Sequence, residues 1–151
     1  MNTTVHYVAP TGFDRAFNAV VGGLTRLGIN LAGAWTLTVT GRKTGQPQRI
    51  PVNPMTLDGT EYLVAVRGET QWVRNVRVTP AAELRRGRKV RGIVVAEVPV
   101  ADRAAIIAAY LGRWGWEVGK FLPGELAADA SAADIAPYAH TIPVFAVRPA
   151  A

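Results

Sequence analysis

The chain has 151 residues, and its hydrophobic content of 49% is enough for one compact domain with its own core. It contains no cysteine, and its only histidines, His6 and His140, lie near opposite ends, so disulfide scaffolds, cysteine nucleophiles and two-histidine metal helices are excluded. The net charge of +6 is concentrated in the middle of the chain, because residues 42–91 hold eleven Lys or Arg against four Asp or Glu. This local excess suggests an anionic ligand, although a solvated basic face is the commoner explanation.

Hydrolytic chemistry has no candidate nucleophile. Ser131 is the only serine, and it stands in an Ala/Asp-rich segment without the rigid turn and adjacent base that a nucleophile needs. The first residues lack a secretory signal, and no stretch is apolar for the about 20 residues of a membrane span. We therefore expect a cytoplasmic protein without a metal site, which either binds a ligand or positions a cofactor that carries the chemistry.

The first predicted element is an amphipathic helix over residues 13–29. Its apolar residues recur at the three-to-four spacing of one helical face, with Asp14 near its start and Gly28 near its end. Most such helices pack on a core. Peripheral contact with a membrane is an open alternative, although Arg15 and Arg26 make only a thin cationic face.

Extended segments follow. Residues 35–40 alternate apolar and polar side chains, as a half-buried strand does. Residues 48–54 predict a second strand, in which Pro51 indicates a sheet edge or a bulge. A tight turn at Asp58-Gly59 leads into a third strand over residues 61–67.

The second half of the chain mixes helices and strands. Residues 72–78 predict one or two helical turns ended by Pro80, and residues 90–100 predict a long fourth strand. A helix over residues 102–114, a looser region rich in Gly, Pro and Ala, and a last strand over residues 141–149 complete the chain. Five strands without regular alternation with helices indicate an α+β, mostly β fold: a small, mainly antiparallel barrel with helices packed outside.

The segment TGRKTGQP, residues 40–47, places two adjacent cations between two glycines directly after a strand. The glycines permit positive φ, and successive N–H groups in such a turn form an anion-binding nest. Arg42 adds a bidentate fork and Lys43 a mobile point charge. An ordinary basic hairpin is the simpler explanation of this segment alone.

A second group of residues follows the third strand. Arg67 and Gly68 stand at its end, and Trp72 and Asn75 are three apart on the next helix, where they share a face. A core role for Trp72 and a capping role for Asn75 remain the simpler alternatives.

The order LTVTGRKTGQPQRIP, then LVAVRG, then WVRN and a proline resembles the deazaflavin-dependent nitroreductase family, within the flavin/deazaflavin oxidoreductases. The resemblance covers residues 33–80 well, and the late helix and PVFAVRP more loosely. It implies a split β-barrel that binds the reduced 8-hydroxy-5-deazaflavin coenzyme F420, whose phosphate and glutamate tail are anionic. The cofactor-binding residues that it implies are Arg42, Lys43, Thr44, Gly45, Pro51, Arg67, Gly68, Trp72 and Asn75.

The resemblance implies an oxidoreductase that transfers a hydride to a small electron-poor acceptor such as a quinone, an enone or a nitro compound. Glu69 departs from the family pattern and places an acid near the anionic tail, so flavin mononucleotide is the alternative cofactor. A non-catalytic flavin-, deazaflavin- or fatty-acid-binding barrel is the alternative function. The oligomeric state, monomer or homodimer, stays open.

Candidates for contact with the acceptor come from position only. They are Tyr110, Trp114, Trp116 and Tyr138, and the first two have a core role on the late helix as their alternative. The basic run over residues 84–91 contains no aromatic residue for base stacking, so we interpret it as a solvated turn and expect no nucleic-acid partner.

Overall fold

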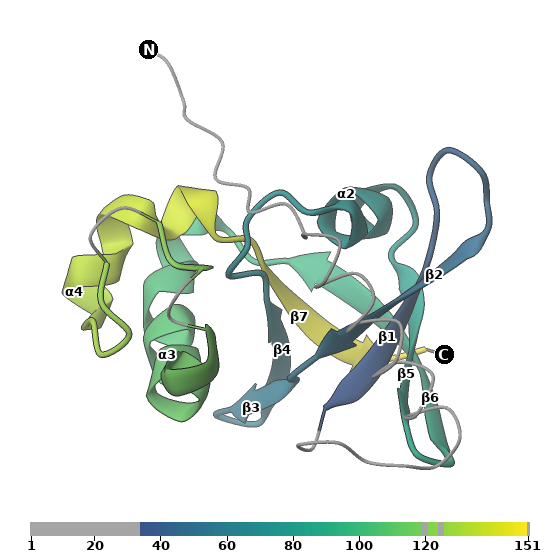
Figure 1. The fold of residues 1–151 in the computed structure, drawn as a ribbon, viewed down its shortest axis with the longest axis horizontal. Helices are drawn as coiled ribbons and strands as arrows, with labels where there is room; N and C mark the ends of the chain where they lie inside the picture. Colours follow the sequence, from purple (N-terminus) through teal and green to yellow (C-terminus); the bar gives the residue numbers. More distant parts are fainter. Residues whose placement is uncertain (1–33, 119–120, 124–125, 151) are drawn as a thin grey trace.

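The structure is a computed structural model that describes residues 34–118, 121–123 and 126–150 (Figure 1). The helix predicted over residues 13–29, and with it the question of membrane contact, lies outside the described residues. None of the helices in the described ranges is both long and apolar enough to cross a membrane.

The described residues form one antiparallel sheet of seven strands. The sequence predicted five strands, so two were missed. The strands are β1 (Trp35–Thr40), β2 (Pro47–Val52), β3 (Met55–Leu57), β4 (Thr60–Val64), β5 (Ala81–Arg86), β6 (Lys89–Glu97) and β7 (Val144–Pro149). Their order in the sheet is β2-β1-β5-β6-β7-β4-β3.

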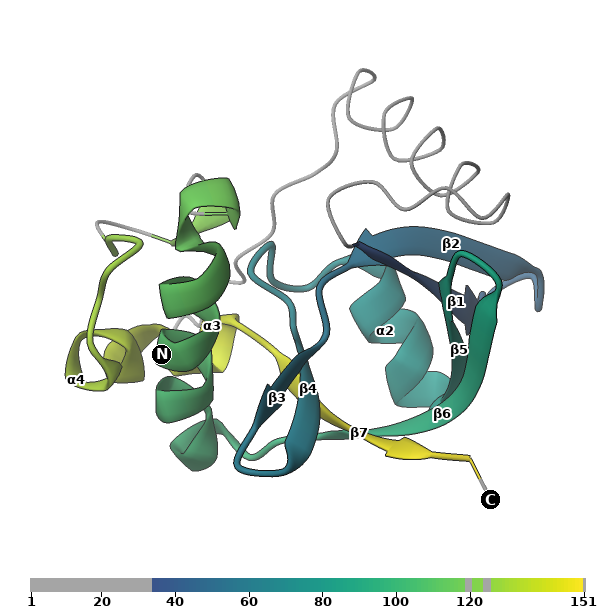
Figure 2. The same ribbon diagram turned by 90° about the horizontal axis from the view of Figure 1, so that it is seen from below.

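This order requires the sheet to curl into a barrel. Strands β2 and β3 lie at opposite edges of the sheet, yet only Asn53 and Pro54 separate them in the chain. A flat sheet of seven strands would hold its edges about 29 Å apart. The connection from Val52 to Met55 spans at most about 11 Å. The two edges therefore come close together, and the fold is a split β-barrel, as Figure 2 shows from below.

Two strands that were missed and one strand that ends early have local causes. Residues 81–86 form β5, which the sequence reading left unassigned, because alanines and charged residues obscure the alternation around buried Leu84. The third strand ends at Val64, because a turn follows in which the Gly68 N–H donates to the Ala65 carbonyl at 2.9 Å. Strand β3 has only three residues, too few for a periodic signal.

Two hydrophobic clusters share the wall made by β4 and β7. Leu63 and Phe145 face the barrel interior, where they pack with Leu37 from β1. Their neighbours Val64 and Val144 face the opposite side, toward the late helix. Because successive side chains of a strand alternate between its faces, the same two strands serve both clusters.

The helices cover different parts of the barrel (Figures 1 and 2). Helix α2 (Gln71–Val78) buries Val73 and Val76 in the barrel cluster and covers one end of the barrel. Helix α3 (Arg103–Val118) packs outside the wall of β4 and β7, and it ends four residues later than the predicted helix. Helix α4 (Ala132–Ile135) and the 3₁₀ helix η3 (Ala136–Thr141) lie against α3.

The only serine has a structural role. The Ser131 hydroxyl accepts a hydrogen bond from the Asp134 N–H, and the Asp134 carboxylate accepts one from the Ser131 N–H, both at 3.2 Å. This reciprocal pair forms a capping box at the start of α4.

Candidate functional site

The basic hairpin between β1 and β2 has a backbone that favours its two glycines. An ideal Cβ at Gly41 would lie 3.0 Å from the main-chain oxygen of Gln46, which is tighter than most Cβ contacts, so a larger residue would require the turn to shift. Gly45 has a φ of 73°, in the left-handed region that other residues seldom adopt. Its N–H donates to the Gly41 carbonyl at 2.8 Å, and this bond closes the turn. The two glycines therefore set the shape in which Arg42 and Lys43 are presented.

Asn75 binds Arg42 twice. Its Oδ1 accepts a hydrogen bond from the Arg42 main-chain N–H at 3.0 Å and another from Arg42 Nη1 at 2.9 Å. The Asn75 side chain lies on α2 and is only 1% exposed. The structure thus brings together two of the predicted site residues, which are 33 positions apart in the chain.

Two glutamines complete this contact, and the sequence analysis missed both. Asn75 Nδ2 donates to Gln48 Oε1 at 2.9 Å, which joins α2 to the second strand of the hairpin. Arg42 Nη1 donates to Gln71 Oε1 at 2.9 Å. Polar residues at a strand start and a helix start are common, so no sequence signal distinguished these two.

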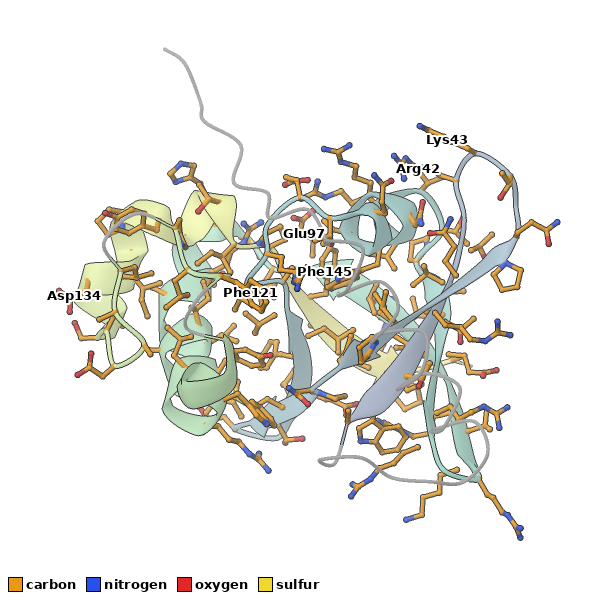
Figure 3. All side chains as sticks on the ribbon, viewed as in Figure 1. Arg42, Lys43, Glu97, Phe121, Asp134 and Phe145 are labelled. Atoms are coloured by element: carbon orange, nitrogen blue, oxygen red, sulfur yellow. The ribbon has the colours of Figure 1, made fainter. Side chains whose placement is uncertain are left out.

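Lys43 and Thr44 begin the exposed part of the hairpin, which covers residues 43–49. Figure 3 shows Arg42 and Lys43 extending from the hairpin toward the side on which α2 lies. Lys43 makes no ion pair with any residue that the structure describes. The Thr44 hydroxyl accepts a hydrogen bond from the Gln46 N–H at 3.2 Å. Lys43 therefore supplies an exposed positive charge on the hairpin next to Arg42.

Arg67 and Gly68 lie in the turn that leads into α2. Gly68 has a φ of 85°, so this turn also uses the left-handed region. The Arg67 guanidinium stacks over the ring of Phe121, 4.0 Å from its centroid. The turn is thus adjacent in the chain to the helix that holds Arg42, while the Arg67 side chain is directed to the segment after α3.

Glu69 is neutralised by an ion pair. Arg77 donates hydrogen bonds to both Glu69 carboxylate oxygens, and it also donates to Glu97 at 3.0 and 2.8 Å. The hydrogen bonds to Glu97 and then to Glu69 raise the pKa of Arg77 above its ordinary value, so this side chain stays charged. The acid that cast doubt on a deazaflavin tail therefore has a counter-ion, Arg77, which it shares with Glu97.

Arg103 extends this ionic contact into the protein. Its Nη2 donates to Glu97 at 3.1 Å, and its other nitrogens donate to the main-chain oxygens of Val98 and Ala139 at 2.9 and 3.1 Å. Burial lowers the pKa of Arg103, which is only 5% exposed, while the Glu97 charge opposes that effect. The loop at Glu69, helix α2, the end of β6 and helix α3 are joined by these contacts.

Trp72 and Pro51 lie away from the cation pair. The Trp72 ring packs 5.6 Å from the ring of Phe145 and is partly buried against the barrel cluster. Pro51 pairs with Thr36 near the far end of β2, about 13 Å along the strand from Pro47. The core alternative for Trp72 thus has direct support, and neither residue contacts the Arg42–Asn75 pair through a hydrogen bond.

The candidates for acceptor contact do not form one group. Tyr110 is 4% exposed and stacks 5.0 Å from Trp114, and both belong to the cluster under α3. Tyr138 lies on η3, where its main-chain oxygen accepts a hydrogen bond from the Thr141 hydroxyl. The side chain of Trp116 lies outside the described residues.

Two other surface features are separate from the cation pair. A shallow depression of about 310 Å³ lies between the hairpin and β5, with Glu83 in its lining. It includes neither Arg42 nor Lys43. The basic run over residues 84–91 forms the β5–β6 hairpin, which turns at Gly87 with a φ of 60°. Arg91 at the end of this run is paired with Glu61 at 2.9 Å.

Solved structures with this fold are diverse. The chain matches the protein Atu2129, of unknown function, from Agrobacterium tumefaciens, with a TM-score of 0.54 and 14% identity over 94% of this chain and 59% of that one. It matches a FAD-binding protein from Mesorhizobium loti with a TM-score of 0.52 and 14% identity, over 88% and 90%. The heme storage protein HutZ from Vibrio cholerae matches with a TM-score of 0.54 and 11% identity, over 78% and 82%. At these identities the likeness concerns the fold alone.

Sequence comparison gives the family. No curated protein matches the chain significantly. The family model of the F420H(2)-dependent quinone reductases matches residues 12–114, which is more than half of the chain and includes the hairpin, the Arg67–Gly68 turn and α2. The chain therefore belongs to the F420H(2)-dependent quinone reductase family, and it is a deazaflavin-dependent oxidoreductase whose cofactor is coenzyme F420.

Proposed function

We propose that this protein transfers a hydride from reduced coenzyme F420 to a quinone, and that the hairpin cations hold the anionic part of the coenzyme. The observation that carries the site is the meeting of Arg42 with the first turns of α2, through Gln71 and Asn75. The turn at Gly68 leads directly into the same helix. Enones and nitro compounds are the competing acceptors.

The donor set fits an anion. Arg42 and Lys43 are cations, and the N-terminal end of the eight-residue helix α2 adds the positive end of its dipole. Glu69, the acid in the turn that leads into α2, is paired with Arg77. A phosphate or carboxylate therefore meets positive charge and N–H donors here without an uncompensated acid beside it.

The role of the protein is to bind and orient. When bound, the reduced coenzyme supplies the hydride, so the chain needs no nucleophile of its own. Arg42, Lys43 and the Thr44–Gly45 turn hold the tail in this proposal. Arg67, Gly68, Trp72, Asn75 and Pro51 define the surface along which the rest of the coenzyme lies. Holding two reactants in register contributes much of the rate of such a transfer.

Turnover tests the reaction. The protein is mixed with reduced coenzyme F420 and a soluble quinone, and the return of the oxidised coenzyme absorbance is followed. We expect turnover with the quinone, and a lower kcat/KM with a nitro compound and an enone in parallel assays. Coenzyme binding without turnover across this panel would contradict the proposed reaction and favour a non-catalytic binding role.

The hairpin cations have a matched control. Replacing Arg42 and Lys43 by alanine should weaken coenzyme binding by about 1.5 to 3 kcal/mol for each lost charge-assisted contact, measured by titration of the coenzyme. Arg88 and Lys89 are an equally adjacent pair of cations, both exposed, in the β5–β6 hairpin. Alanine at both control positions removes the same net charge and should leave the affinity within about twofold, because screening limits distant charges. Equal losses in the two double variants would remove the hairpin from the site.

A further inference from the structure

The orientation of the Arg42 guanidinium is fixed by hydrogen bonds inside the protein. Both Asn75 Oδ1 and Gln71 Oε1 lie 2.9 Å from Arg42 Nη1 and accept from it. Nη1 carries two protons, so these two oxygens use all of its donor capacity. Arg42 Nε and Nη2 make no hydrogen bond with the residues of the described ranges. The Nε/Nη2 edge, whose two N–H groups point in parallel, is therefore available for a bidentate oxyanion.

Asn75 has little capacity left for a ligand. Its Oδ1 accepts two hydrogen bonds from Arg42, one Nδ2 proton is donated to Gln48, and the side chain is 1% exposed. An amide oxygen accepts two hydrogen bonds, so the acceptor side of Asn75 is saturated. The residue therefore holds the hairpin turn at Arg42 and strand β2 at Gln48.

We propose that Asn75 and Gln71 are positioning residues that hold Arg42 Nη1, so that the Nε/Nη2 edge forms a preset fork for an oxyanion of the coenzyme, and that Asn75 does not touch the coenzyme. This inference rests on the proposed function and reassigns Asn75 within it. The oxyanion is the phosphate or a carboxylate of the tail, which share the bidentate geometry. Without the two amide oxygens the guanidinium would rotate, and part of its affinity would be lost to side-chain ordering.

A double-mutant cycle separates positioning from direct contact. We expect Asn75→Ala to weaken coenzyme binding about tenfold, the scale of one charge-assisted hydrogen bond. In an Arg42→Ala background the same substitution should change the affinity by less than about twofold, because its effect passes through Arg42. Additive losses would show that Asn75 contacts the coenzyme and would overturn the proposal. Gln71 is exposed, so a cycle with Gln71→Ala gives the same test without disturbing a buried site.

Hydrogen exchange gives a readout without the coenzyme. The Arg42 main-chain N–H donates to a buried oxygen, so it should exchange slowly in the free protein and at least about tenfold faster in Asn75→Ala. Arg49→Ala, an exposed cation on β2, is the control and should leave the exchange of Arg42 unchanged. Unchanged Arg42 exchange in Asn75→Ala would mean that the amide does not hold the hairpin, against the proposal.

Shortened ligands identify the oxyanion and separate this inference from the function. Asn75→Ala should weaken the full coenzyme but not the deazaflavin riboside, which lacks phosphate and tail. An equal loss of affinity for the riboside would contradict the proposal that the Arg42 fork binds an oxyanion. If the loss persists for the riboside phosphate, the fork binds phosphate, and if it disappears there, the fork binds a tail carboxylate. Failure of the unaltered protein to bind the coenzyme would instead remove the proposed function.

Discussion

The ion pair of Glu69 with Arg77 determines the charge of the turn that leads into α2. From the sequence, Glu69 was an acid beside an anion site and a reason to consider a different cofactor. In the fold, Arg77 in the last turn of α2 pairs with both Glu69 and Glu97. The local charge at this turn is therefore set by Arg77, which the sequence analysis counted only as one of many cations.

Removing Arg77 should expose this compensation. We expect Arg77→Met to weaken coenzyme binding about threefold to tenfold at low salt, because Glu69 loses its counter-ion, whereas Glu97 keeps Arg103. The loss should shrink as ionic strength rises, since these groups are partly exposed and screened. Titration at two salt concentrations measures both effects.

A rescue variant replaces both members of the ion pair by uncharged residues. Glu69→Gln in the Arg77→Met background should recover most of the affinity, because the uncompensated acid is gone. If the double variant binds no better than Arg77→Met alone, the loss comes from displaced structure and the electrostatic explanation is wrong.

At the scale of elements, periodic segments were predictable and short or sparsely apolar ones were not. Residues 35–40 and helix α3 carried clear patterns, and the Asp58-Gly59 turn has the two positive φ values, 50° and 81°, that its sequence predicts. β5 was missed because its core contact depends on Leu84 and small Ala82. The Arg42–Asn75 pair was predicted only as two members of one site. Its hydrogen bonds depend on packing between distant segments, which no local pattern encodes.

Helix α3 offers one substitution with opposite expected results at two positions. Among the described residues, none has an atom within 4 Å of an ideal Cβ at Gly112, whereas one at Gly115 would lie 2.9 Å from the Ala128 main-chain oxygen. Gly112→Ala should raise the free energy of unfolding by up to about 1 kcal/mol, through helix propensity. Gly115→Ala should lower it by about 1 to 3 kcal/mol, because backbone must move. Urea unfolding of both variants measures the pair, and equal shifts would contradict the packing of α3 on Ala128.

On the scale of the whole molecule, the shared wall of β4 and β7 connects the two hydrophobic clusters. Phe145 faces one cluster and its neighbour Val144 faces the other, and both are almost completely buried. Loss of either cluster leaves one face of this wall in water. We therefore predict that the barrel and the α3 layer unfold as one unit, in agreement with the single domain expected from the sequence.

Substitutions in the two clusters test this prediction. Ile107 in α3 and Leu37 in β1 are both fully buried, so Ile107→Ala and Leu37→Ala should each cost about 2 to 5 kcal/mol. With native-state hydrogen exchange, each variant should reduce the protection of the slowest amides in β1 and in α3 by the same free energy. Wild-type protection of β1 amides in Ile107→Ala would mean that the two layers unfold separately.

The prolines of β2 have a consequence for how the sheet ends. β2 is an edge strand, and its pairing with β1 runs unbroken from Trp35 to Thr40. Pro47 and Pro51 have no N–H, so they fit at strand positions whose nitrogen faces away from β1. Arg49 lies between them in the same alternation, so its N–H also points to the outer edge. Two of these three outward positions cannot donate, and the third carries a charge. A foreign strand would find an incomplete template, so this edge resists the strand addition that begins many β aggregates.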